Sequence, residues 1–206
     1  IRDSSTSRGL GDVYKRQFVN FAVDGIDETL QIYTTRPDTL FGVTFMVIAP
    51  EHPLIDKYAD RITNMDEIKA YREECAKKTE FERTQLVKEK TGVCIQGLEG
   101  VNPVNGKKIP IYIADYVMMG YGTGAIMAVP AHDQRDYDFA KKFGIDIIQV
   151  IKGGDISKEA YTGDGEMVNS GELNGITNKK DAIEKMLGVL AKLGCGEKGV
   201  QYKMKD

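Results

Sequence analysis

The sequence predicts an α+β fold in which helices are inserted into a β-rich core. Residues 18–35 alternate apolar and polar side chains and are broken once by Asp24 and Gly25, which indicates a β-hairpin. Residues 51–91 are rich in charged, helix-forming side chains, and a second group of short strands follows over residues 91–130. Because strands and helices do not alternate regularly, a parallel βαβ sheet is not expected.

Length, composition and charge limit the class of protein. The 206 residues are 41% hydrophobic and 29% charged, which suits one large domain or two small ones. No run of about 18 apolar residues could span a bilayer, and residues 1–17 do not resemble a signal peptide, so we expect a cytoplasmic protein without a membrane partner. The formal net charge of −3 argues against binding of long nucleic acid through phosphates, but not against recognition of a short single-stranded end.

The first half of the chain predicts a hairpin, a buried strand and a helical segment. Residues 1–17 have no apolar pattern and are expected to form a disordered arm. The hairpin strands cover residues 18–23 and 28–35, and the apolar stretch 41–50 predicts a buried strand. Within residues 51–91 the apolar side chains at helical spacing predict one or two helices.

The second half predicts strands, two helices and a loop. An Asn-Gly step at residues 105–106 favours a turn between strands, and residues 133–143 predict a helix that ends at Gly144. Residues 145–151 read as a strand and residues 153–175 as a glycine-rich loop. The last predicted element is an amphipathic helix, with Thr177 as a candidate N-cap and Gly194 as a candidate C-cap.

The stretch YTTRPDTLFG, residues 33–42, predicts a strand that ends abruptly in polar residues. Pro37 lacks a backbone N–H and restricts Arg36, so a central strand cannot continue through them. A compact, rigid and polar strand end suits a binding site. The alternative is a strand-ending turn that an ion pair between Arg36 and Asp38 stabilises.

The stretch GYGTGAIMAVPAHDQRD, residues 120–136, has two interpretations. Its three glycines could indicate a dinucleotide-binding loop, but a strand-like segment follows where that loop needs a helix. The glycines are better explained by a substrate that lies against the backbone, with a polar pocket completed by the residues after them. Asp133 and Asp136 lie in the first turn of the predicted helix, where a carboxylate could bind a cationic amine or simply cap the helix.

Neither the histidines nor the cysteines indicate a metal site. His132 lies beside Asp133, but the chain has one other histidine, His52, and no second pair of ligands with metal spacing. His132 is therefore expected to form a hydrogen-bonding wall of the pocket. The cysteines are far apart in the sequence and lack both disulfide and metal-pair spacing: Cys75, Cys94 and Cys195. No metal and no cofactor is expected.

A metal-free hydrolytic site needs donors for an oxyanion, a group that positions water and an anchor for the substrate. The two stretches together contain side chains that could supply all three: Thr34, Thr35, Arg36, Asp133 and Asp136.

The segments TTRPDTLFGVTFMVIAPEHPL and YGTGAIMAVPAHDQRDYDFAKKFGI resemble the editing domain of bacterial-type leucyl-tRNA synthetases. MAVPAHDQRD indicates the leucine enzyme rather than its isoleucine and valine relatives. The resemblance runs over residues 18–206 and includes GDGEMVNSGELNG, whereas residues 1–17 match nothing and look foreign. It implies a β-barrel-like core with peripheral helices, the fold shared by the editing domains of the valine, isoleucine and leucine enzymes.

The resemblance also implies an activity and a partner. Editing domains of this family hydrolyse the ester that joins a wrong amino acid, here norvaline, isoleucine or methionine, to the 3′ CCA end of the leucine tRNA, and they spare leucyl-tRNA. Such a second step is needed because one methylene is worth only about 1–3 kcal/mol of discrimination.

Family resemblance assigns roles to individual residues. Asp136 is expected to hold the α-ammonium group of the substrate, and Thr39 to exclude the γ-branched side chain of leucine. Thr34 and Thr35 are expected to contact the ester and the attacking water. Arg36, oriented by Asp38, is expected near the terminal nucleotide. The remaining pocket residues implied by the resemblance are Tyr121, Met127, Val129 and His132.

The synthetic site of the ligase is not recognisable in this chain, so ATP use and leucine activation are not expected of it. Three functions remain open: an editing hydrolase, a module that binds the aminoacylated tRNA end with negligible turnover, and an amino-acid binder or structural fragment without a tRNA role. Activity on mischarged tRNA separates the first two. Binding of a non-hydrolysable aminoacyl-adenosine analogue separates the second from the third.

Overall fold

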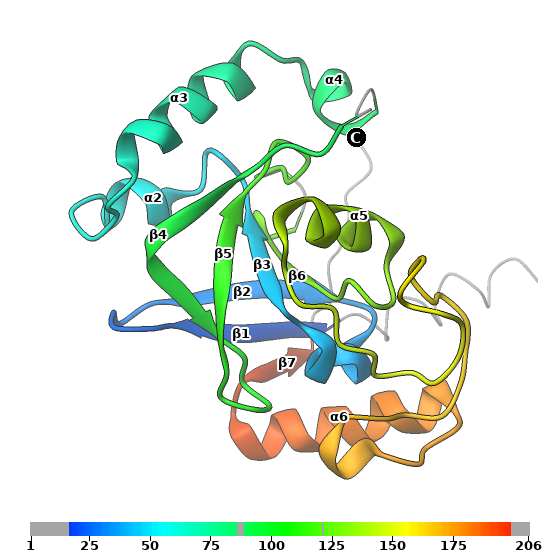
Figure 1. The fold of residues 1–206 in the computed structure, drawn as a ribbon. Helices are drawn as coiled ribbons and strands as arrows, with labels where there is room; N and C mark the ends of the chain where they lie inside the picture. The colour runs from blue at the N-terminus through cyan, green and yellow to red at the C-terminus, as the bar shows by residue number, and fades with distance from the viewer. Residues whose placement is uncertain (1–16, 86–88, 121, 199–206) are drawn as a thin grey trace, which may run out of the picture.

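The computed structural model describes residues 17–85, 89–120 and 122–198, and its centre is one mixed β-sheet (Figure 1). The sheet has seven strands, listed here in chain order: β1 (Gln17–Val23), β2 (Thr29–Thr34), β3 (Phe45–Ile48), β4 (Val93–Val101), β5 (Lys108–Ile113), β6 (Ala125–Ala128) and β7 (Gly196–Lys198). They are arranged in the order β2-β1-β4-β5-β3-β6, with β7 paired to β1. All pairs are antiparallel except β3 with β5.

The sheet curls into a nearly closed barrel. Its two end strands, β2 and β6, approach each other, and the hydroxyl of Thr123, just before β6, donates a hydrogen bond to the carbonyl of Gln31 in β2. The predicted α+β class with a barrel-like core is therefore confirmed. So is the hairpin, whose strands β1 and β2 pair in antiparallel register from Gln17 with Thr34 to Ala22 with Thr29.

Helices surround the barrel, as the sequence predicts. They are η1 (Pro37–Gly42), α2 (Pro53–Lys57), α3 (Met65–Ala76), α4 (Glu80–Thr84), α5 (Gln134–Phe143), η2 (Gly171–Leu173) and α6 (Lys179–Leu193), where η marks a 3-10 helix. Figure 1 shows α3 and α6 at opposite ends of the molecule. None of the helices in the described ranges is long and apolar enough to cross a membrane.

The described part of residues 51–91 contains three helices where one or two are predicted. The helical pattern is interrupted by residues that start new helices rather than continue old ones. Thr79 begins α4 with a capping box, in which its hydroxyl accepts from Glu82 N and the Glu82 carboxylate accepts from Thr79 N. Local capping thus divides a segment whose composition alone favours a longer helix.

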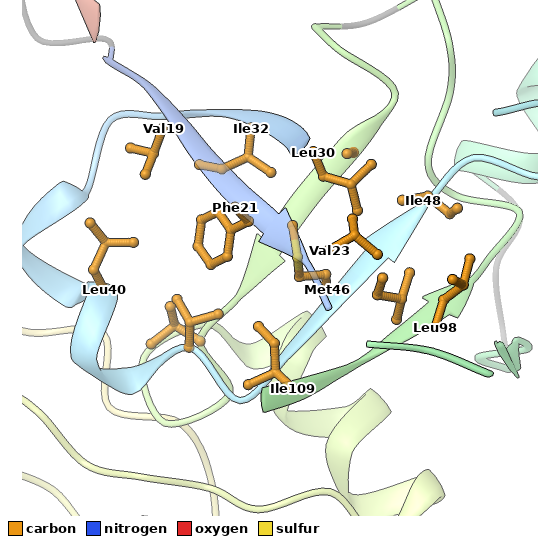
Figure 2. Packing of buried hydrophobic residues seen from close by; sticks show 14 of the residues in the cluster. Val19, Phe21, Val23, Leu30, Ile32, Leu40, Met46, Ile48, Leu98 and Ile109 are labelled. Atoms are coloured by element: carbon orange, nitrogen blue, oxygen red, sulfur yellow. The ribbon is translucent and has the colours of Figure 1, made fainter. Parts of the chain in front are cut away.

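Strand β3 is buried on both faces, which explains its unbroken apolar sequence. Met46 and Ile48 point into the barrel interior with side chains of the other strands (Figure 2). Phe45 and Val47 lie in a second cluster on the outer face. There Phe45 stacks on Phe139 of α5 with ring centroids 5.2 Å apart, so α5 covers this side of the sheet.

The predicted strand over residues 145–151 is wrong. The segment is irregular, and only Ile151 forms an isolated bridge, with Met167. The N–H groups of Val150 and Ile151 both donate to Nε2 of His132, each over 3.0 Å. At Val150 and Ile151, a ring nitrogen of His132 is thus the acceptor that the carbonyl groups of a neighbouring strand would otherwise provide.

The predicted arm over residues 1–17 lies outside the described residues except for Gln17. Gln17 is buried and is the first residue of β1.

Helix α6 begins one residue later than predicted and ends as predicted. Asn178, not Thr177, is its N-cap, because Oδ1 of Asn178 accepts from Lys180 N at 2.9 Å and from Asp181 N at 3.3 Å. Gly194 is the C-cap and has a φ of 68°, a left-handed conformation that glycine adopts without strain.

Replacing Asn178 by alanine is expected to lower the free energy of unfolding by about 1 kcal/mol, since it leaves two N–H groups of the first turn without their acceptor. Thr177→Ala is the matched control, because Thr177 is exposed and should change stability by less than about 0.5 kcal/mol. Urea unfolding followed by circular dichroism measures both. Equal losses in the two variants would contradict the assignment of the cap.

Candidate functional site

A cleft of about 500 Å³ lies where the end of β2, η1, β6 and the start of α5 meet. Nine of the predicted site residues line it: Thr34, Thr35, Arg36, Thr39, Met127, Val129, His132, Asp133 and Asp136. Asp38 does not line this cleft, and Tyr121 lies outside the described residues. Closure of the barrel between β2 and β6 thus brings the two sequence motifs to one place.

The first motif ends strand β2 through local hydrogen bonds. The hydroxyl of Thr34 accepts from Arg36 N over 2.9 Å, and Pro37 starts η1, where its missing N–H costs nothing. The guanidinium of Arg36 donates to both carboxylate oxygens of Asp38, over 3.1 Å and 2.9 Å. Asp38 is buried while Arg36 remains partly exposed, so the fixed carboxylate orients an arginine that lines the cleft.

Thr39 lines the cleft, but its hydroxyl proton is already used in a hydrogen bond within η1. Its Oγ1 donates to the carbonyl of Arg36 over 2.9 Å, and its backbone N–H donates to the same oxygen over 3.2 Å. The side chain is almost fully buried in η1. These bonds hold the side chain in one orientation at the wall of the cleft.

The second motif places two aspartates in different roles. Asp133 is the N-cap of α5, with Oδ1 accepting from Asp136 N over 3.0 Å. Asp136 is buried, and its Oδ2 accepts from Val129 N over 3.0 Å. The helix-capping alternative therefore describes Asp133, whereas the Asp136 carboxylate is held inside the cleft by the backbone of another element.

The Asp136 carboxylate is short of positive charge within the cleft. Burial, with Asp133 nearby, raises its pKa to about 7, against the opposing effects of the Val129 N–H, Arg135 and Lys90. A carboxylate that is costly to ionise becomes a good partner for a cation that enters with its own charge.

His132 lines the cleft as a neutral imidazole, and both of its ring nitrogens form hydrogen bonds with backbone groups. Its Nδ1 lies 2.7 Å from the carbonyl of Tyr161, and its Nε2 accepts from Val150 N and Ile151 N. The proton must therefore lie on Nδ1. Burial lowers the pKa of the ring, which keeps this form neutral. Both ring nitrogens serve the backbone, so neither is left to act as a general base.

No group of three or more His, Cys, Asp or Glu side chains within the described ranges is arranged to hold a metal ion.

The glycines of the second motif do not contact the cleft, contrary to the prediction that they let a substrate lie against the backbone. None of Gly120, Gly122 and Gly124 lines it. Gly122 and Gly124 have φ values of 66° and 74°, and a Cβ on Gly124 would lie 2.3 Å from Sδ of Met119. They are needed for the turn that leads into β6.

Three further residues line the cleft without having been predicted as site residues: Tyr33, Ile126 and Arg135. Tyr33 and Ile126 belong to the strands whose neighbouring residues are predicted. Arg135 is exposed, and its guanidinium lies 5.4 Å from the ring centroid of Tyr116. It also lines a second cleft of about 390 Å³, so a positive charge stands between the two clefts. Its position inside AHDQRD is the signal that could have identified it.

Comparison with known proteins gives the same family by sequence and by structure. The model of the family described as "Leucyl-tRNA synthetase, editing domain" matches residues 16–190. A leucine–tRNA ligase of Alkaliphilus oremlandii (strain OhILAs) is 55% identical over 190 residues, which cover 91% of this chain and 23% of that protein. The LeuRS of the crystal structure described as the ternary complex of Agrobacterium radiobacter K84 agnB2 LeuRS-tRNA-LeuAMS matches 98% of this chain and 22% of its own, with a TM-score of 0.70 and 31% identity.

Proposed function

Because the chain belongs to the family of leucyl-tRNA synthetase editing domains, we propose that its cleft hydrolyses the ester between a wrong amino acid and the 3′ end of the leucine tRNA. The observation that carries this proposal is the meeting of two distant motifs in one cleft, where buried Asp136 accompanies the polar end of β2. The chain spans 23% of the length of the ligase it matches, so the rest of such a synthetase is a proposed partner.

Asp136 is proposed to bind the α-ammonium group of the misattached amino acid. The carboxylate is fixed by Val129 N and lacks a full counter-charge, so an ammonium group gains strong attraction in this partly dry cleft. The bound cation also lowers the pKa of the carboxylate again and keeps it ionised. This contact fixes the amino-acid end of the substrate.

Thr39 is proposed to exclude leucine. Its side chain is immobilised by the hydrogen bond to the carbonyl of Arg36, so it cannot move away from a γ-branched side chain. Norvaline is unbranched, isoleucine branches at Cβ, and methionine is linear beyond Cβ; all three avoid a block at that depth. Met127, Val129, His132 and Tyr121 complete the proposed amino-acid pocket.

The terminal nucleotide is proposed to lie beside Arg36 and Arg135, since both guanidinium groups line the cleft. Asp38 holds the first of them in place. The solved relative was crystallised in a complex with tRNA, which supports tRNA as the partner.

Hydrolysis is proposed to proceed by attack of water on the ester carbonyl. Thr34 and Thr35 position the water and the ester, with help from the neighbouring ribose hydroxyl of the substrate. The tetrahedral intermediate then collapses, the bond to the ribose oxygen breaks, and that oxygen takes up the proton that the attacking water gives up. Because His132 is occupied by backbone groups, positioning rather than a side-chain base supplies most of the rate.

The proposed activity is expected to fall as the pH drops below 7, because protonation of Asp136, whose pKa is about 7, removes the charge that binds the ammonium group. Once the uncatalysed rate is subtracted, kcat/KM for norvalyl-tRNA should decrease about tenfold per pH unit on the acid side. Asp136→Asn cannot titrate and should show a low, flat profile. A wild-type profile that is flat between about pH 5 and about pH 8 would contradict the raised pKa of the carboxylate.

The test of the proposed function is deacylation of norvalyl-tRNA and leucyl-tRNA, both charged on the leucine tRNA, by the purified protein beside a no-protein control. Loss of the norvaline ester alone is the expected result. If neither ester is lost but a non-hydrolysable aminoacyl-adenosine analogue binds, the protein is a binding module instead. If the analogue does not bind either, the tRNA-related functions are both wrong for this chain.

A further inference from the structure

Asn102 is a fully buried polar residue that joins the turn after β4 to the 3-10 helix η1. Its Nδ2 donates to the carbonyl of Leu40 over 2.9 Å, across 62 residues of sequence. Its Oδ1 accepts from Val104 N over 3.1 Å. The amide oxygen therefore bonds within its own turn, and the amide nitrogen bonds to η1. Exchanging the two atoms by a flip of the amide would break both hydrogen bonds.

The bond from Asn102 fixes the backbone beside Thr39. Leu40 follows Thr39 directly, and its side chain is buried in the barrel interior (Figure 2). Within η1, the carbonyl of Leu40 accepts from Val43 N over 3.2 Å, and no side chain caps the start of the helix. Asn102 thus adds a hydrogen bond from a different element at the residue next to the proposed steric block.

We propose that Asn102 is a positioning residue for the exclusion of leucine, acting through Leu40 and Thr39. This inference rests on the proposed function. Asn102 does not line the cleft and touches no substrate. It sets how far η1, and with it the Thr39 side chain, extends toward the bound amino acid.

The chemistry of the amide matters for this role. A carboxylate at position 102 has nearly the same shape and still accepts from Val104 N, but it has no donor for the carbonyl of Leu40. Two oxygen atoms would then face each other at the former hydrogen-bond distance, and η1 would be pushed away. Asn102→Asp therefore removes the donor to Leu40 and adds a buried negative charge, while it keeps the size of the side chain and the hydrogen bond within the turn.

The experiment measures initial rates of leucyl-tRNA and norvalyl-tRNA deacylation by the wild-type protein, Asn102→Asp and Asn105→Asp. Asn105 is the matched control, because it lies in the same turn, is exposed, and uses only its acceptor oxygen, toward Lys107 N. The ratio of leucine to norvaline clearance is expected to rise about tenfold in Asn102→Asp, since a shift of about 1 Å can change a rate by about 100-fold. Asn105→Asp should keep the wild-type ratio.

A double variant shows whether Asn102 acts through Thr39. In a Thr39→Ala background, Asn102→Asp should change the ratio no further, because the group that it positions is already absent. Additive effects would overturn the proposal, as would an unchanged ratio in a folded Asn102→Asp protein.

Should Asn102→Asp not fold, Asn102→Ser replaces it, since the shorter side chain also cannot reach Leu40. Failure of the wild-type protein to clear norvalyl-tRNA would count against the proposed function, whereas selective wild-type clearance with an unaffected variant would count against this inference alone.

Discussion

Replacing Thr39 by alanine is expected to make the domain hydrolyse leucyl-tRNA, with a rise of about 10- to 200-fold over the wild-type rate, the range that one methyl-sized difference in a pocket can supply. The side chain is almost fully buried and its hydroxyl is bonded to the carbonyl of Arg36, so it fills a fixed volume at the cleft wall. Alanine removes that volume. Norvalyl-tRNA should be cleared by both proteins.

Thr39→Val separates shape from hydrogen bonding in this prediction. Valine keeps the branched shape but cannot donate to the carbonyl of Arg36. Exclusion of leucine should persist in Thr39→Val if volume is the cause. A Thr39→Ala protein that clears norvalyl-tRNA yet leaves leucyl-tRNA untouched would show that the block lies elsewhere.

Replacing Asp136 by alanine is expected to abolish editing while the protein remains folded. Removing one member of a buried pair of opposite charges costs about 2–5 kcal/mol of binding, or about 30-fold to more than 1,000-fold in kcat/KM. Alanine also leaves Val129 N without its acceptor, so some loss of stability is expected in this variant.

Asp136→Asn is the control that keeps the fold intact. Its amide oxygen can still accept from Val129 N, but the negative charge is gone. Burial raises the pKa of the native carboxylate to about 7, well above that of an unfolded aspartate. The ionised group therefore destabilises the folded state fully above pH 7, and this cost decreases as the pH falls from 7 toward the ordinary pKa of an unfolded aspartate. At pH 8 the thermal midpoint of Asp136→Asn should equal or exceed that of the wild type. Undiminished editing in either folded variant would remove the ammonium-binding role.

The barrel and its helices could largely be predicted because their signals are local. Alternation marks the hairpin, Gly144 and Gly194 mark helix ends, and the Asn-Gly step marks the turn at Gly106, which has a φ of 69°. The strand predicted over residues 145–151 is wrong, and at its end the N–H groups of Val150 and Ile151 donate to a histidine side chain rather than to a strand. Nothing in the sequence IDIIQVI, whose seven residues include Asp146 and Gln149, identifies such a partner.

In the candidate site, too, local sequence signals could be predicted but contacts between distant segments could not. Residues within the two polar motifs could be placed in one cleft by family resemblance, and the structure brings nine of them together. Their geometry could not be predicted, because it depends on contacts between distant segments. The NPVNG sequence indicates a turn, but gives no sign that Asn102 reaches Leu40. Likewise, the burial that raises the pKa of Asp136 arises only once α5 packs on the sheet.

The cleft lies at the seam where the first and last strands of the curled sheet meet. On the proposed function, the width of that seam also affects how well Thr39 separates norvaline from leucine. Thermal loosening of the seam then admits larger side chains before it disrupts Asp136 and Val129, which are both anchored on the β6 side. On the proposed function, warming such a domain toward its melting point is therefore expected to make it destroy correctly charged tRNA before it stops removing errors.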